Sequence, residues 1–324
     1  ERSRASRDNN ESMASQKPDL MAFVEPSTFV YDLTSVQGKV IGLFKDGVKT
    51  DEITDKGEVI FDTTPFYAEM GGQCGDTGSL NNETTHANVV NTLNAPNKQH
   101  MHFVEVKEGA IHLGDTFTLS IDQQKRRQIT ANHSATHILQ KALQETLGDH
   151  ISQAGSYVDD KVLRFDFTHF QAMTSEEIQK VEDLVNDKIM EVDTVETKLM
   201  TIEEAKESGA TALFDEKYGD KVRVVVAGEF SKELCGGTHV SNTNAISSFK
   251  IISESGVAAG VRRIEALTGR AAIKYMEEKQ RLLKEACSAL KCTEKDVLKK
   301  ISSQGAELKE KDKEIAELKS KLTS

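Results

Sequence analysis

The chain has 324 residues, of which 37% are hydrophobic, and it carries a formal net charge of −11 at pH 7. This length and apolar content are enough for two domains with buried cores, which excludes disorder as the general description. The acidic balance argues against a protein that coats nucleic acid non-specifically, because phosphate affinity comes largely from Lys and Arg, although it leaves room for a local basic strip.

No apolar run approaches the roughly 20 residues that span a bilayer, and the beginning of the chain is polar and charged. We therefore expect a soluble, cytoplasmic protein without membrane contact. The four cysteines are widely scattered and do not resemble a disulfide framework, so reduced thiols are expected: Cys74, Cys235, Cys287 and Cys292.

Residues 1–25 are rich in Arg, Ser, Asp and Asn, and this composition predicts the end of a polar helix followed by a linker. The first residue is Glu1, which favours a sequence cut from a longer chain. Residues 26–122 alternate short β-type runs with Gly, Asn and Asp, a spacing that predicts a small β-barrel. The expected strands lie at 39–44, 58–62, 86–90, 102–106 and 116–121.

Residues 123–269 interleave helical and strand patterns, which indicates an α+β domain. Helices are expected near 130–147, 175–191 and 201–208, and strands near 162–167, 194–200, 222–228, 246–253 and 261–266.

Residues 270–324 predict a helical extension that begins a coiled coil, since apolar residues recur at a spacing of seven among Lys and Glu: Ile301, Leu308, Ile315 and Leu322, with Leu318 as a second seam position. Such a helix requires a partner helix, and self-association is one way to supply it. The alternative is a solvated single helix. The predicted fold class is α+β, with a small barrel, an α+β domain and this extension in chain order.

Two histidines, His133 and His137, lie four residues apart in the predicted helix near 130–147. Residues at this spacing share one helix face, so both rings can reach a single metal ion. A metalloprotease with this spacing needs a Glu beside the first His as general base. Ser134 occupies that position, which excludes this class of enzyme.

A second pair, Cys235 and His239, has the same spacing and encloses Gly236 and Gly237, which let the backbone turn tightly after the thiol. Together the two pairs offer three imidazoles and one thiolate, the donor set that Zn²⁺ prefers in a tetrahedral site. The other three cysteines are not expected to bind this ion.

Several motifs resemble the editing domain of the alanyl-tRNA synthetase family and the barrel that precedes it. They follow in order as PFYAEMGGQ at 65–73, HSATH at 133–137, QAGS at 153–156, LRFDF at 163–167, CGGTH at 235–239 and GVRRIEA at 260–266. The likeness covers nearly the whole chain. Related editing modules occur as free-standing proteins and in threonyl-tRNA synthetases, but the closing helix and the polar lead-in favour a piece of a bacterial-type synthetase.

The resemblance implies hydrolysis of mischarged tRNA(Ala), with release of serine or glycine from its acceptor end. It further implies that the α+β domain is the zinc-containing editing domain, with His133, His137, Cys235 and His239 as the zinc ligands. Gln153 would lie in the substrate pocket, and Thr136 would lie close to the aminoacyl group. Because no stretch resembles an aminoacylation site, the chain is expected to edit without charging tRNA.

Four protein ligands complete a tetrahedral shell, whereas catalytic zinc keeps one position open. Either one ligand is displaced, with Cys235 or His239 as candidates, or the metal orients the substrate while Gln153 or backbone groups hold the attacking water. We favour the second arrangement. Thr136 and Gln153 are also candidate partners for a serine hydroxyl. The alternative roles are a helix-interior threonine bonded to its own preceding turn, and a turn residue before Gly155.

Two basic clusters can contact the tRNA backbone near the acceptor end, although charged residues at such positions are often only solvated. They are Lys125, Arg126 and Arg127 in one cluster, and Arg262 and Arg263 in the other.

A protein of another class fits the same pattern, namely a zinc-stabilised module that binds the tRNA acceptor end without cleaving it. A second alternative is a metal-dependent esterase that acts on small molecules. The glycines of the 71–73 segment either bring backbone close to a ligand or form a β-turn between barrel strands.

Overall fold

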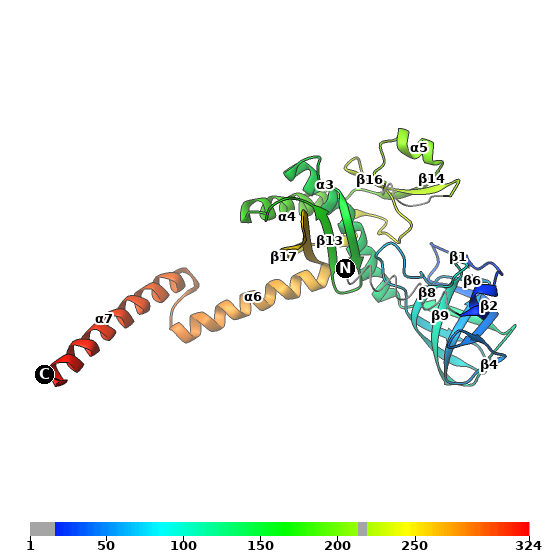
Figure 1. The fold of residues 1–324 in the computed structure, drawn as a ribbon, viewed down its shortest axis with the longest axis horizontal. Helices are drawn as coiled ribbons and strands as arrows, with labels where there is room; N and C mark the ends of the chain where they lie inside the picture. Colours follow the sequence, from blue (N-terminus) through cyan, green and yellow to red (C-terminus); the bar gives the residue numbers. More distant parts are fainter. Residues whose placement is uncertain (1–16, 213–218, 324) are drawn as a thin grey trace. The chain divides into compact units, whose positions relative to one another are not determined.

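The computed structural model of the chain describes residues 17–212 and 219–323 (Figure 1). Most of the predicted N-terminal linker, residues 1–16, lies outside the described residues. The linker's remaining part contains a short helix that the sequence pattern missed, α2 (Pro18–Ala22). The described residues form two compact units, one that ends at Gly269 and one that begins at Arg270.

The first part of the larger unit is a β-barrel. Its strands are β1 (Thr28–Phe29), β2 (Ser35–Lys45), β3 (Val48–Lys49), β4 (Glu52–Ile53), β5 (Lys56–Phe61), β6 (Thr63–Thr64), β7 (Gly78–Asn81), β8 (His86–Asn94), β9 (His100–Glu108), β10 (Ile111–His112) and β11 (Thr116–Ile121). Among the described residues, the strands pair in the order β11-β7-β8-β9-β5-β2, and β11 also pairs with β2, which closes a ring of six. The predicted barrel is confirmed.

The barrel interior is filled by side chains that alternate along its strands. In β11, Phe117, Leu119 and Ile121 are buried while the residues between them are not, and they join Val59, Phe61, Leu80 and Val104 in one core. Every second side chain of a strand lies on the same face. The alternation of apolar and polar residues in the sequence is therefore the signal from which these strands were predicted.

The second part combines helices with strands, as predicted, and its strands form two sheets. The helices are α3 (Gln123–Leu147), α4 (Ser175–Met190) and α5 (Ile202–Glu207), and a 3₁₀ turn, η1, spans Thr243–Ile246. The larger antiparallel sheet has the strand order β12 (Gln153–Val158), β13 (Leu163–Thr168), β18 (Val261–Thr268) and β17 (Phe249–Ala258). The smaller sheet consists of β14 (Val195–Met200), β15 (Val222–Ala227) and β16 (Ser231–Leu234). Among the strands of four or more residues, β7, β12 and β16 were not predicted, and neither were the two-residue strands β1, β3, β4, β6 and β10.

Helix α3 is the central element of this part. Its N-terminus is capped by Asp122, whose side chain accepts from the Lys125 backbone N–H. It packs against α4 and against the β12-β13-β18-β17 sheet, and Ile138 and Leu139 are buried in one core with Phe165 and Ile264. Because α3 is held on its apolar face, the residues of its first half have fixed positions.

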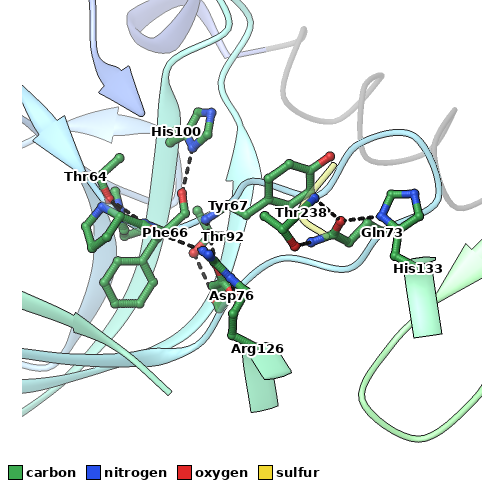
Figure 2. A network of polar contacts seen from close by, with 12 residues as sticks. Thr64, Phe66, Tyr67, Gln73, Asp76, Thr92, His100, Arg126, His133 and Thr238 are labelled. Atoms are coloured by element: carbon green, nitrogen blue, oxygen red, sulfur yellow. Dashed lines mark hydrogen bonds and ion pairs between the residues drawn. The ribbon is translucent and has the colours of Figure 1, made fainter. Parts of the chain in front are cut away.

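A buried ion pair joins the start of α3 to the barrel. The Arg126 guanidinium donates to both carboxylate oxygens of Asp76 and to the Pro65 carbonyl, and Arg126 is only 8% exposed (Figure 2). The Asp76 carboxylate also accepts from the Tyr67 backbone N–H. Arg126, assigned by sequence to the tRNA backbone, is instead committed to this pair, because a buried guanidinium with these partners has no face for a phosphate.

The smaller unit is helical, as predicted. It contains most of α6 (Gly269–Leu290), a 3₁₀ turn (Glu294–Asp296) and α7 (Val297–Thr323). The apolar seam residues of α7 are exposed within the described chain: Ile301, Leu308, Ile315, Leu318 and Leu322. Across residues 17–212 and 219–323, no helix is both long and apolar enough to cross a membrane.

Arg126→Ala is expected to lower the free energy of unfolding by about 3–5 kcal/mol, because it leaves the Asp76 carboxylate buried without its cation. Arg127→Ala is the matched control, since it removes the same charge from an exposed neighbour and should stay within about 0.5 kcal/mol. Urea unfolding followed by circular dichroism measures both values, and similar small losses would contradict the role of the Arg126–Asp76 pair.

Candidate metal centre

The two motif pairs meet in space. His133 and His137 extend from one face of α3, and Cys235 directly follows β16. One ligand atom from each of His133, His137, Cys235 and His239 lies within 4.8 Å of the others. The Cys235 Sγ is 3.4 Å from His133 Nε2 and 3.3 Å from His239 Nε2. Nitrogen and sulfur ligands on one tetrahedral zinc ion lie about 3.5 Å apart, given the usual bond lengths, so this spacing fits the ion.

The 235–239 loop reaches α3 because Gly237 has no side chain. A Cβ atom there would collide with the His133 ring and would lie 2.7 Å from the Gln73 Oε1. The backbone of Gly237 does not adopt a positive φ, so close approach, and not a left-handed turn, explains this glycine.

The loop is further fixed through its carbonyl groups. Arg223, on β15, donates from Nη1 to the Gly237 carbonyl at 2.8 Å. Its guanidinium lies over the Tyr31 ring, 3.6 Å from the centroid, and the Tyr31 hydroxyl donates to the Gly236 carbonyl at 2.9 Å. Side chains from β15 and from the barrel therefore hold the turn that carries Cys235.

Each imidazole has a polar partner at its Nδ1 atom. His133 Nδ1 is 2.7 Å from the Gln73 Oε1, and His239 Nδ1 is 3.0 Å from the Ser134 Oγ. His137 Nδ1 faces the Glu233 carboxylate at 3.4 Å. A partner that accepts from Nδ1–H leaves the lone pair on Nε2, the atom that binds metal, and this arrangement is typical of metal-binding histidines.

Burial keeps the three rings neutral. It lowers the pKa of His133 to about 4 and lowers the pKa of His137 and of His239 well below the usual value, and the neighbouring rings and Arg223 add to the effect. Burial also raises the pKa of Glu233 to about 8. At pH 7 the imidazoles are therefore neutral, which is the charge state that binds a metal ion.

The cluster offers three neutral nitrogen donors and one sulfur donor. This donor set fits Zn²⁺ better than Mg²⁺ or Ca²⁺, which prefer oxygen ligands. All four donors come from the protein. The cluster therefore has the donor composition of a closed, four-ligand zinc shell.

The two predicted substrate residues have different surroundings. The buried Thr136 hydroxyl donates to the Asn132 carbonyl one turn earlier at 2.9 Å, as a helix-interior threonine does. Gln153 is the first residue of β12, opposite Phe167, and is not a turn residue. Among residues 17–212 and 219–323, no hydrogen bond engages its side-chain amide, which is half-buried.

The predicted tRNA-contacting residues also differ. Arg262 donates from Nε to Glu254, and Arg263 makes two bonds to Asp166 at 2.7 and 2.9 Å. Lys125 is half-buried and Arg127 is exposed at the start of α3. Of the predicted tRNA-contacting residues, Lys125 and Arg127 are the two without a carboxylate partner among residues 17–212 and 219–323.

Three residues around the metal ligands were not predicted: Gln73, Ser134 and Glu233. Glu233 precedes Cys235 by two positions at the end of a strand, and a period of two would have placed both on one face. Ser134 served only to exclude a protease. Gln73 carries no local signal, because it belongs to the barrel and approaches His133 only in the folded chain.

The family described as "tRNA synthetases class II (A)" matches residues 1–125, and "Threonyl and Alanyl tRNA synthetase second additional domain" matches residues 222–265. The second match includes Cys235 and His239.

The whole chain is similar to proteins named alanine-tRNA ligase. It is 47% identical to that of Listeria monocytogenes serotype 4b (strain F2365), 48% to that of Listeria monocytogenes serovar 1/2a (strain EGD-e), and 46% to that of Listeria innocua serovar 6a. In each case the alignment covers 100% of this chain and 37% of the relative. The chain therefore spans little more than a third of the length of these relatives.

The purified protein is expected to hold about one zinc ion per chain, and Cys235→Ala is expected to lower this content sharply, because three imidazoles alone leave the shell open. Cys292→Ala is the control, since it removes a thiol from the helical unit. Inductively coupled plasma mass spectrometry measures the zinc content. Zinc retained at the wild-type level in Cys235→Ala would contradict the assignment of this ligand.

Proposed function

Because the chain is homologous over its whole length to part of the alanine-tRNA ligases and so belongs to their family, we propose that it edits mischarged tRNA(Ala). The reaction is hydrolysis of the ester that links serine or glycine to the acceptor end, in the cytoplasm. The observation that carries the proposal is the convergence of His133, His137, Cys235 and His239, in a chain whose 222–265 segment matches the additional domain of threonyl and alanyl synthetases.

A zinc ion bound by this cluster would supply positive charge close to the ester carbonyl. With four protein ligands, its proposed role is to fix the ligand-bearing segments and orient the aminoacyl group. The attacking water then needs another partner. Gln153 is proposed for this role, because its amide is unbonded among the described residues and both donates and accepts hydrogen bonds.

Thr136 is proposed to recognise a serine side chain. Its own proton is committed to the Asn132 carbonyl, so the Thr136 oxygen can only accept, and a serine hydroxyl can donate to it. A hydrogen bond of this kind contributes about 0.5–1.5 kcal/mol, or roughly 2- to 13-fold. The contact favours serine over alanine and has no counterpart for glycine.

Lys125 and Arg127 are proposed to contact the phosphates near the acceptor end, because both extend from the start of α3 and neither has a carboxylate partner among the described residues. Arg262 and Arg263 remain candidates with weaker support, since Glu254 and Asp166 already neutralise them. Phosphate contacts of this kind position a nucleic acid without reading its sequence.

The exposed apolar seam of α7 is proposed to pair with a second helix, either from another copy of the chain or from another protein. Sedimentation equilibrium checks the first option: a monomer at all concentrations would exclude self-association through α7.

Under single-turnover conditions the protein is expected to release free serine from Ser-tRNA(Ala), and Gln153→Leu is expected to slow this release by about tenfold or more, because the water loses its proposed partner. Gln179→Leu is the control, since it makes the same replacement on the exposed face of α4. The rate is measured by acid precipitation of labelled aminoacyl-tRNA.

Two outcomes would contradict this function. Intact binding of Ser-tRNA(Ala) without serine release would favour a zinc-stabilised module that binds the acceptor end only. Equal rates on a short seryl ester without tRNA would favour an esterase for small molecules.

A further inference from the structure

Gln73 comes from the barrel, yet its side chain lies among the ligand-bearing segments of the metal centre. It belongs to the segment between β6 and β7, residues 65–77, which we name the barrel loop. At its tip, Met70 and Gln73 exchange backbone hydrogen bonds of 3.2 and 3.0 Å around Gly71 and Gly72. Both glycines have positive φ values, 61° and 89°, a conformation that favours glycine.

The barrel loop is fixed to the α+β part on both sides of Gln73. The Gly72 carbonyl accepts from the Val158 N–H at 2.7 Å, and the Cys74 N–H donates to the Val158 carbonyl at 3.0 Å. Asp76, three residues after Gln73, accepts hydrogen bonds from the Arg126 guanidinium. Since α3 carries both Arg126 and His133, the loop and the histidine share one rigid support.

The Gln73 side chain makes three hydrogen bonds and is 1% exposed (Figure 2). Its Oε1 accepts from the Thr238 backbone N–H at 2.9 Å, and its Nε2 donates to the Thr238 hydroxyl oxygen at 2.7 Å. These two bonds set the orientation of the amide, because a backbone N–H can only face the oxygen. The same oxygen lies 2.7 Å from His133 Nδ1.

The orientation of the amide determines the tautomer of His133. An amide oxygen has no proton to give, so Nδ1 of His133 must carry the hydrogen and Nε2 must carry the lone pair. Thr238 belongs to the same loop as Cys235 and His239. One side chain thus joins the α3 ligands to the loop ligands and sets the form of the imidazole that binds metal.

We propose that Gln73 is a positioning residue of the metal centre. The barrel loop would then contribute directly to the editing site. The inference rests on the proposed metal centre and adds a residue from outside the ligand motifs. Partners of this kind typically change metal affinity by about 10- to 100-fold when they are removed.

The experiment compares zinc affinity in the full chain, measured by competition with a chromogenic chelator. Gln73→Met keeps the length of the side chain and removes its polar atoms, and it is expected to lower zinc affinity by about 10- to 100-fold. Gln73→Glu is expected to stay close to the wild type, because a carboxylate accepts from both His133 Nδ1 and the Thr238 N–H, and the Thr238 hydroxyl can then donate.

Gln99→Met is the matched control. Gln99 is 2% exposed in the barrel and donates to the Phe23 and Glu25 carbonyls, away from the metal ligands. It should lose stability and keep wild-type zinc affinity. Should Gln73→Met fail to fold, Thr238→Val removes one of the three bonds and is expected to lower the affinity several-fold.

A second readout separates positioning from packing. In metal-free protein with ¹⁵N-labelled histidine, His133 is expected to carry its proton on Nδ1, and Gln73→Met is expected to populate the other tautomer as well. Wild-type zinc affinity in Gln73→Met would overturn the inference and leave the metal centre intact. A wild-type protein that binds no zinc would overturn both.

Discussion

The interaction on which this structure depends is the contact between three imidazoles and one thiol that are brought together from α3, whose two histidines are buried, and from the half-buried Cys235 and His239 of the 235–239 loop. His133 and Cys235 are 102 residues apart in sequence, and their side chains lie 3.4 Å apart. Burial favours the neutral form of each ring, and the Nδ1 atoms face Gln73, Glu233 and Ser134. The proposed binding of zinc depends on this arrangement, because it brings donors from α3 and from the 235–239 loop to one point.

The barrel does more than precede the α+β part in the chain. Its loop reaches His133 through Gln73, its Tyr31 holds the Gly236 carbonyl, and its Asp76 binds Arg126 at the start of α3. These contacts connect the barrel to the candidate metal centre through short polar bonds, which are buried at Gln73 and Asp76 and partly buried at Tyr31. The stability of the barrel and the geometry of the centre are therefore expected to be coupled, because polar groups buried without their partners are costly.

Much of the fold, and the four candidate metal ligands, could be predicted from the sequence because they follow local patterns. The alternation of buried and less buried residues in β11 follows from the geometry of one strand. The i,i+4 spacing of His133 and His137 follows from the geometry of one helix. Short strands such as β12, which begins at Gln153 and contains a bulge, lack that regularity and were missed. Arg126 was assigned to tRNA because an arginine beside two other basic residues gives no sign that Asp76, fifty positions earlier, will bury it. Gln73 was considered only as part of a glycine turn for the same reason, since its partners are distant in sequence.

The most direct test of the account is the coordination shell of the bound metal. X-ray absorption spectroscopy at the zinc edge is predicted to show three nitrogen ligands at about 2.0–2.1 Å and one sulfur ligand at about 2.3 Å. A shell without sulfur, or one made of six oxygen atoms, would show that His133, His137, Cys235 and His239 do not bind one ion together, and the account of the centre would be wrong.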